Sequence, residues 1–251
     1  VYKRQKTYTI DLMEGENKIQ ISVMNNNGAE SFKETIYINS DEKQNKDLYV
    51  VAIGTSKYKD NRFDLKYAAK DAEDVTEMFE DNKLYAAVHN LLLTNENVTK
   101  ENIFEVKEFL KSVKVNDVVI LFVAGHGVLN KDYDYYYCTH DIDFNHPEKR
   151  GISYTDLEAL FDGIKAIKKL LIMDTCHSGE VDKDEIEEIE KVTIEEEDII
   201  FRSTSTTVLR ERKGLKQTNE IVKEMFNDLN RGTGTTVISS AGGIEFAMES
   251  D

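Results

Sequence analysis

The sequence has no long hydrophobic run. None of its apolar stretches approaches the roughly 18 to 20 residues that a membrane span needs. Its first residues also lack the apolar core of a signal peptide. We therefore expect no membrane segment and no membrane partner.

Cysteine is also scarce. Cys138 and Cys176 are the two in the sequence, too few for the disulfide framework of a small secreted protein. This scarcity favours a reducing, cytoplasmic location and a chemical role for one thiol. A single structural disulfide between the two is the alternative.

Positive charge is in short supply as well. The chain has 32 Lys and Arg against 48 Asp and Glu, for a net charge of −16. Such a protein repels polyanions, which argues against nucleic acid as a direct ligand. Hydrophobic residues make up 40% of the chain and aromatic residues 9%, enough for a packed globular core.

The N-terminal part, residues 1–40, has a β-rich pattern. Short alternating segments at 7–12, 17–25 and 31–39 are separated by turn-like stretches. Three strands without a second layer are marginally stable. We therefore interpret this part as the tail of an upstream, regulatory β-sandwich-like domain, joined through the polar linker 41–47.

The pattern changes at residue 48. Continuous apolar runs suited to strands buried on both faces alternate with helical periodicity, which is typical of a parallel sheet with helical crossovers. We predict an α/β domain over 48–251 with a mainly parallel central sheet flanked by helices. The expected strands begin near residues 48, 88, 117, 168 and 235.

Helix signals support this organisation. Leu65, Ala68, Ala72, Val75 and Phe79 share one helical face. A second helix is predicted after Thr99, its expected N-cap, and a third begins with Ser153 and Asp156 at capping-box spacing.

Two of the predicted strands end in reactive side chains. "VVILFVAGHG" contains His126 near its end, and "LLIMDTCHSG" contains Cys176 near its end. Because the carboxyl ends of parallel strands meet at one edge of a sheet, both should lie there. Histidine can take the proton of the thiol, and the resulting thiolate is the nucleophile needed for acyl transfer. Backbone N–H groups near Gly127 and Cys176 would then face the oxyanion.

These residues resemble a known family. "FVAGHG" followed by "MDTCHSG" is similar to the two signature blocks of the caspase–metacaspase cysteine peptidases, in the D-x-C-H-S-G form of metacaspases. The resemblance covers residues 48–251. It implies a caspase-hemoglobinase fold, His126 as base, Cys176 as nucleophile and Gly127 N–H as oxyanion donor. The family usually works as a dyad, so we nominate no third catalytic member.

The resemblance also bears on specificity. "LKYAAKDA", residues 65–72, looks like the block that places an aspartate in the pocket for the residue before the scissile bond. That aspartate matches Asp71, and its family partner matches Asp174. Two carboxylates favour Arg or Lys, with Arg preferred for bidentate contact. Arg62 offers a competing interpretation, in which it lines a pocket for acidic substrate residues. The alternative is that Arg62 is an ordinary surface residue.

The region 180–216 is first acidic and then basic. We interpret it as an exposed linker between subdomains, and the resemblance implies self-processing there. Family members usually add a core strand and pocket loops after the segment that ends this chain. We therefore expect a missing C-terminal part, carried on a separate small-subunit chain, removed by cleavage or encoded beyond residue 251.

Metal sites are a weaker interpretation. Zinc-type ligands occur at Cys138, His140, Asp143 and His146, without a second Cys pair. The same stretch fits a strand and its exit loop, with Cys138 in the core. Calcium activates some metacaspases, and the acidic loops offer oxygen ligands, but no EF-hand pattern is present. We predict no metal site and no required cofactor.

The sequence therefore predicts a cysteine endopeptidase acting on protein substrates after basic residues. Two alternatives remain open. One is a catalytically silent caspase-like scaffold that works through interactions. The other is a thiol acyl hydrolase, such as an amidase, acting on a small substrate.

Overall fold

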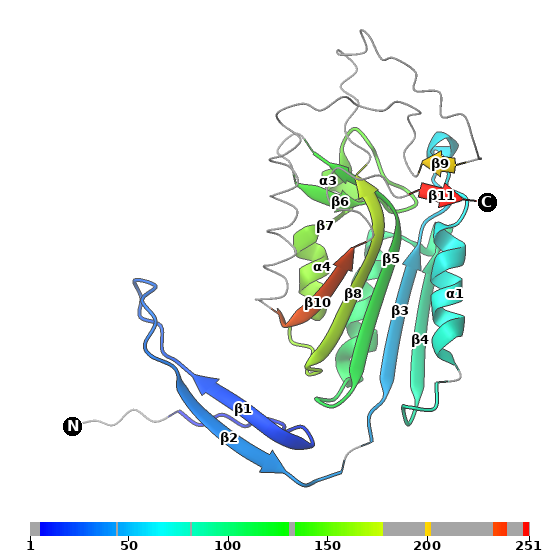
Figure 1. Ribbon diagram of the computed structural model, residues 1–251. Coiled ribbons are helices and arrows are strands. Elements are labelled where there is room, and N and C mark those ends of the chain that lie inside the picture. The colour runs from blue at the N-terminus through cyan, green and yellow to red at the C-terminus, as the bar shows by residue number, and fades with distance from the viewer. Residues whose placement is uncertain are drawn as a thin grey trace.

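A computed structural model describes residues 6–43, 45–80, 82–130, 134–177, 199–201, 233–239 and 248–250 of the 251-residue chain (Figure 1). At residues 176–177, 199–201 and 248–250 it describes the backbone alone. Within these ranges, no helix has the length and apolar character needed to cross a membrane.

The core of the molecule is a parallel sheet with the spatial order β10-β8-β5-β3-β4 (Figure 1). Every residue of β3 is buried, as expected for a strand covered on both faces. The predicted apolar runs correspond to β3 (Leu48–Gly54), β4 (Val88–Thr94), β5 (Val118–Leu129), β8 (Lys168–His177) and β10 (Thr235–Ser239). The predicted fold class is confirmed.

Short antiparallel strands extend this sheet at its carboxyl edge. β6 (Tyr135–Tyr137) pairs with the end of β5 and with β7 (Ile152–Ser153). β9 (Ile199–Phe201) and β11 (Met248–Ser250) form a separate antiparallel pair.

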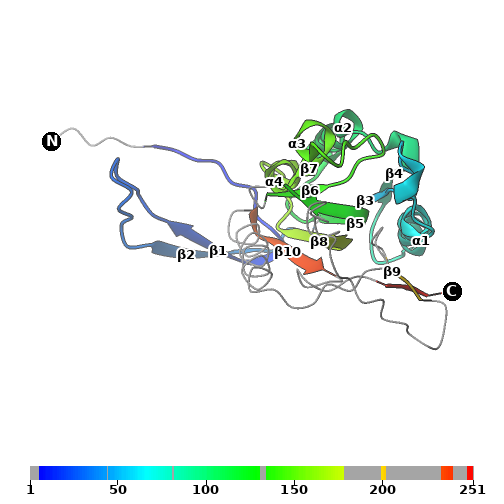
Figure 2. The same cartoon turned by 90° about the horizontal axis from the view of Figure 1, so that it is seen from above.

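Helices cover both faces of the sheet (Figure 2). α1 (Ala68–Glu80) packs on the face formed by even-numbered residues of β5, whereas α2 (Lys100–Phe109) and α4 (Tyr154–Phe161) pack on the odd-numbered face. Thr99 caps α2 and the capping box at Ser153 begins α4, both as predicted. The short helices are η1 (Asn61–Phe63), η2 (Asn95–Asn97), η3 (Leu110–Ser112) and α3 (Pro147–Arg150).

Close packing of α1 on β3 depends on Gly54. A Cβ at this position would overlap the carbonyl oxygen of Ala68 and lie 2.8 Å from both Ala69 Cα and Ala72 Cβ. Two of these three contacts are backbone atoms that a rotamer change cannot move. The small residues Ala68, Ala69 and Ala72 thus bring the start of α1 to the carboxyl end of β3.

Gly54→Ala should therefore destabilise the protein by about 3 kcal/mol, because α1 must move away from the sheet. This corresponds to a fall in Tm of about 6 to 12 °C for a chain of this size. Gly163→Ala is the matched control: Gly163 has a φ of +73° and open space around its Cβ position, so it should cost only about 1 kcal/mol of backbone strain. Equal Tm shifts in thermal unfolding would contradict the packing argument.

The N-terminal part forms a two-stranded antiparallel sheet of β1 (Gly15–Ile21) and β2 (Glu34–Ser40). The strand expected at 7–12 is wrong: this segment joins no sheet, and Tyr8 and Ile10 are exposed. None of the strands in the described part of the chain lies beside it to supply a ladder of backbone hydrogen bonds. The assignment of residues 1–40 to an upstream β-sandwich-like domain stays a prediction.

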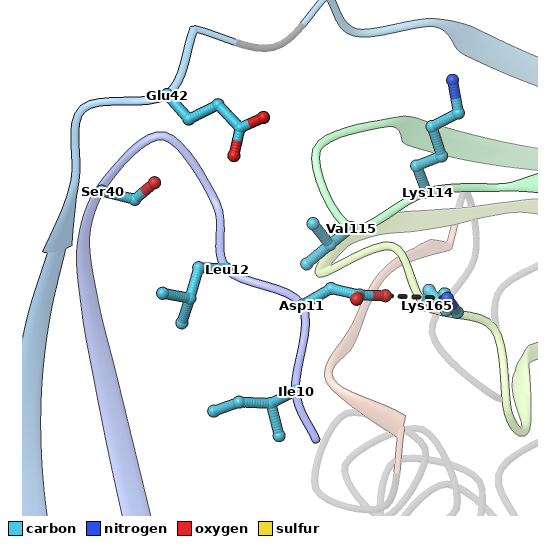
Figure 3. Close-up of a pocket in the computed structure, with 8 residues that line it drawn as sticks. All are labelled: Ile10, Asp11, Leu12, Ser40, Glu42, Lys114, Val115 and Lys165. Carbon is cyan, nitrogen blue, oxygen red and sulfur yellow. Dashed lines mark hydrogen bonds and ion pairs between the residues drawn. The ribbon is translucent and has the colours of Figure 1, made fainter.

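A cavity of about 390 Å³ lies between this N-terminal part and the loops around Lys114 and Lys165 (Figure 3). Lys165 Nζ pairs with Asp11 Oδ2 at 2.7 Å, and Ile10, Leu12 and Val115 supply apolar lining. Lys114 and Lys165 precede β5 and β8 in the chain. The cavity therefore lies at the amino end of the strands, opposite the edge where His126 lies.

Candidate active site

His126 and Cys176 lie side by side near the carboxyl ends of β5 and β8. The strand register pairs these two residues directly, with Ala124 opposite Asp174 and Gly127 opposite His177. Adjacent strands are about 4.8 Å apart. Positions 126 and 176 also fall on the same face of the sheet, because residues opposite one another in a parallel pair share a face.

The imidazole of His126 is held by a backbone carbonyl. His126 is 1% exposed, and its Nε2 lies 2.9 Å from the carbonyl oxygen of Phe63. A carbonyl can only accept, so Nε2 carries the proton. In the neutral ring Nδ1 is then the basic nitrogen. Sequence reasoning missed this partner, since a carbonyl has no residue-type signal.

Aromatic rings surround the same imidazole. The Tyr58 ring centroid lies 5.1 Å from that of His126, and the rings of Phe63 and Phe144 meet it edge-on. Phe63 and Phe144 also stack on each other at 3.7 Å. These contacts restrict rotation of the imidazole and help to hold its Nε2–H on Phe63.

The backbone of His126 is fixed separately. Its N–H donates to the hydroxyl oxygen of Tyr58 at 2.9 Å, and its carbonyl accepts from the N–H of Cys138 at 2.9 Å. Burial raises the pKa of Tyr58 well above its usual value, so the phenol stays neutral. Both the N–H and the carbonyl of His126 are thus held by hydrogen bonds.

Gly125 allows the hydroxyl of Tyr58 to lie close to the backbone before His126. Its φ is +145°, and a Cβ would lie 3.1 Å from Tyr58 Oη and 3.3 Å from the carbonyl oxygen of Thr55. Only glycine adopts such a backbone conformation without strain. The glycine before His126 is therefore required by the local geometry.

Two tyrosines of β6 bind the ends of neighbouring strands. Tyr137 donates its hydroxyl hydrogen to the carbonyl oxygen of Ala124 at 2.9 Å and pairs with Thr55 Oγ1 at 2.8 Å. Tyr135 Oη lies 2.9 Å from Oγ1 of Thr175, the residue before Cys176.

Cys138 has the properties of a core residue. It is fully buried and free of any disulfide, and burial raises the pKa of its thiol. A neutral thiol of this kind is unreactive near pH 7. The structure thus supports the interpretation of Cys138 as a small core hydrophobe.

The predicted specificity residues lie on the α1 face of the same edge. Asp71 is half-buried in the first turn of α1, whose start is anchored by the Ala69 N–H donating to Ser56 Oγ at 2.8 Å. Asp174 is half-buried in β8, two positions before Cys176. Gly127 pairs with His177 on one side and with Tyr137 on the other.

Arg62 is a surface residue in the structure. Its guanidinium is exposed and pairs with Asp60 at 2.6 Å. Hydrogen bonds from Arg62 lower the pKa of the Asp60 carboxyl. This local pairing accounts for Arg62 without an acid-binding pocket.

The hypothetical zinc ligands do not come together. Cys138 is in the core, His140 Nδ1 lies 2.7 Å from the carbonyl oxygen of Lys57, and His146 pairs with Glu148. No group of three potential metal-binding side chains occurs among the residues that the structure describes. The predicted linker 180–216 lies outside the described residues, apart from 199–201.

Comparisons with known proteins agree with this architecture. A crystal structure of a protein from Geobacter sulfurreducens is similar with a TM-score of 0.50 and 17% sequence identity, covering 80% of this chain and 75% of that one. At this identity the likeness concerns the fold alone. No curated protein matches the chain. A family model described as the caspase domain matches residues 48–239. This match spans most of the chain, which therefore belongs to the caspase-domain family.

Proposed function

We propose that this protein is a cysteine endopeptidase that cleaves proteins after Arg or Lys by a Cys176–His126 dyad. The observation that supports it most is the register of β5 and β8, which pairs positions 126 and 176. The hydrogen bond from His126 Nε2 to the Phe63 carbonyl adds to this, because it makes Nδ1 the basic nitrogen of the neutral ring.

In the proposed reaction, Cys176 Sγ attacks the peptide carbonyl while its proton passes to His126 Nδ1. The imidazolium then protonates the leaving amine, the C–N bond breaks and a thioester forms. Water attacks the thioester with His126 again as the base, which releases the acid and restores the thiol. The Phe63 carbonyl stabilises the imidazolium, and Gly127 N–H donates to the oxyanion.

Specificity for basic residues rests on Asp71 and Asp174. Both lie on the α1 face of the sheet at the edge that carries His126. A guanidinium entering between two carboxylates gains charge-assisted hydrogen bonds that an uncharged side chain lacks. Arginine should therefore be preferred to lysine, because its planar fork binds carboxylates in a bidentate manner.

Hydrolysis of paired fluorogenic peptides tests the function. An arginyl peptide should be cleaved at least about 100-fold faster, in kcat/KM, than the citrullyl peptide of the same shape, since citrulline loses the charge. An aspartyl peptide should not be cleaved. Repeating the assay with added calcium reports on calcium activation. No cleavage under either condition would favour a scaffold, and equal cleavage of the arginyl and citrullyl peptides would favour a general thiol acyl hydrolase.

Self-processing in the region 180–216 is part of the proposal, because the basic residues there, such as Arg202 and Arg210, fit the proposed specificity. The intact chain should be cut after one of these residues in the active protein and should stay whole in Cys176→Ala. Intact-mass spectrometry of purified protein measures both. The same cut in the Cys176→Ala variant would show that another protease makes it.

A further inference from the structure

The hairpin that carries His126 also contacts the strand that carries Cys176. β6 is fixed to His126 through backbone atoms, by the Cys138 N–H donating to the His126 carbonyl and by the pairing of Gly127 with Tyr137. From the same short strand, Tyr135 reaches Thr175 with a hydroxyl pair at 2.9 Å. Both partners are buried, at 2% and 4% exposed.

We propose that Tyr135 is a positioning residue of the dyad, acting through the hydroxyl of Thr175 to hold the backbone at Cys176 beside His126. This inference rests on the proposed function, since it assigns a role within that site. Tyr135 lies on the opposite face of the sheet from His126, among the core residues under α2 and α4. Its proposed role is therefore to position the backbone at Cys176 and not to contact the substrate or the reacting atoms.

A side-chain anchor has a physical purpose at this point. Among the described backbone pairs between β5 and β8 are residue 125 with residue 175 and residue 126 with residue 176. The buried hydroxyl pair restrains residue 175 directly, so the neighbouring position 176 is held by more than these backbone pairs.

Two variants remove the anchor with little change in shape. Tyr135→Phe keeps the ring, and Thr175→Val keeps the side-chain volume. Each should lower the rate of Cys176 alkylation by iodoacetamide about fivefold at neutral pH, the effect of one lost hydrogen bond. The rise of this rate with pH should move to higher pH, because a thiolate forms less readily when the imidazole is badly placed.

Peptide hydrolysis by these two variants should show a lower kcat with an unchanged KM. The double variant should lose no more than either single variant, because the two hydroxyls form one interaction. Thr175→Ser, which keeps the hydroxyl, should recover most of the alkylation rate lost in Thr175→Val.

Tyr49→Phe is the matched control. Tyr49 is a buried tyrosine near the start of β3 whose hydroxyl lies 3.1 Å from Ser112 Oγ, at the other end of the sheet. It should lower Tm about as much as Tyr135→Phe while leaving the alkylation rate and its pH profile unchanged.

The outcomes separate this inference from the proposed function. If Tyr135→Phe matches Tyr49→Phe in rate and pH profile while the unaltered protein shows a reactive Cys176, the positioning role is wrong and the dyad stands. If Cys176 of the unaltered protein reacts no faster than a simple model thiol, both the dyad and this inference are overturned.

Discussion

Cys176→Ala should lower kcat/KM for an arginyl peptide by at least about 10³-fold, because no other group in the proposed site can form the thioester. His126→Ala should cause a similar loss, since the thiol then loses the base that the proposed dyad assigns to it. Initial rates of fluorogenic peptide hydrolysis, normalised to folded protein by circular dichroism, provide the measurement.

Cys138→Ala is the control for loss of a thiol. Cys138 lies in the core beside the His126 hairpin, so its removal tests whether a nearby packing change alone can reduce activity. It should retain activity within about threefold per folded molecule, because a small buried side chain affects packing more than chemistry. Comparable losses in Cys138→Ala and Cys176→Ala would contradict the assigned nucleophile.

The two carboxylates of the proposed pocket should have the next largest effect. Asp71→Asn and Asp174→Asn keep the shape of the side chain but remove its charge. Each should lower kcat/KM for the arginyl peptide by about 10- to 100-fold, as expected for a lost charge-assisted hydrogen bond. Hydrolysis of the citrullyl peptide should hardly change.

Asp74→Asn is the matched control on the same helix. Asp74 is exposed in α1 and pairs with Lys70 at 2.6 Å, so its substitution alters the charge of α1 without touching the proposed pocket. It should leave the ratio of arginyl to citrullyl cleavage unchanged and shift stability by less than about 0.5 kcal/mol. If Asp74→Asn and Asp71→Asn had equal effects, the preference for arginine would come from the overall charge of α1 and not from a specific pocket.

Much of the fold was predictable because local signals were strong. Continuous apolar runs predicted the strands of the parallel sheet. Thr99 and Ser153 predicted where two helices begin, because their side chains accept hydrogen bonds from the first helical turn. The pairing of positions 126 and 176 was foreseeable in outline, since both follow buried strands. The register itself was not, because it depends on how far each strand continues past its apolar run.

The segment 7–12 shows where pattern reasoning fails. Its alternation is that of a strand, but a strand requires a neighbouring strand, and among the residues that the structure describes 7–12 pair with none. By contrast, β1 and β2 pair over their full seven residues. Pairing is a tertiary property that a single sequence segment does not encode.

The groups that support His126 were beyond sequence reasoning for a similar reason. The Phe63 carbonyl contributes a main-chain atom, which every residue type possesses. The sequence shows that Tyr58 and Tyr135 have hydroxyl groups. It does not show their hydrogen-bond partners, which lie 68 and 40 residues away in the chain. Only the folded arrangement brings such partners together.

Covalent labelling with an arginyl chloromethyl ketone tests the central claim most directly, because the reagent needs the pocket, the imidazole and the thiol in one place. Peptide mapping by mass spectrometry should find the adduct on Cys176 alone, with the labelling rate lost in His126→Ala and reduced in Asp71→Asn. An unmodified Cys176, or labelling that persists unchanged without His126, would contradict a catalytic pair at this edge of the sheet.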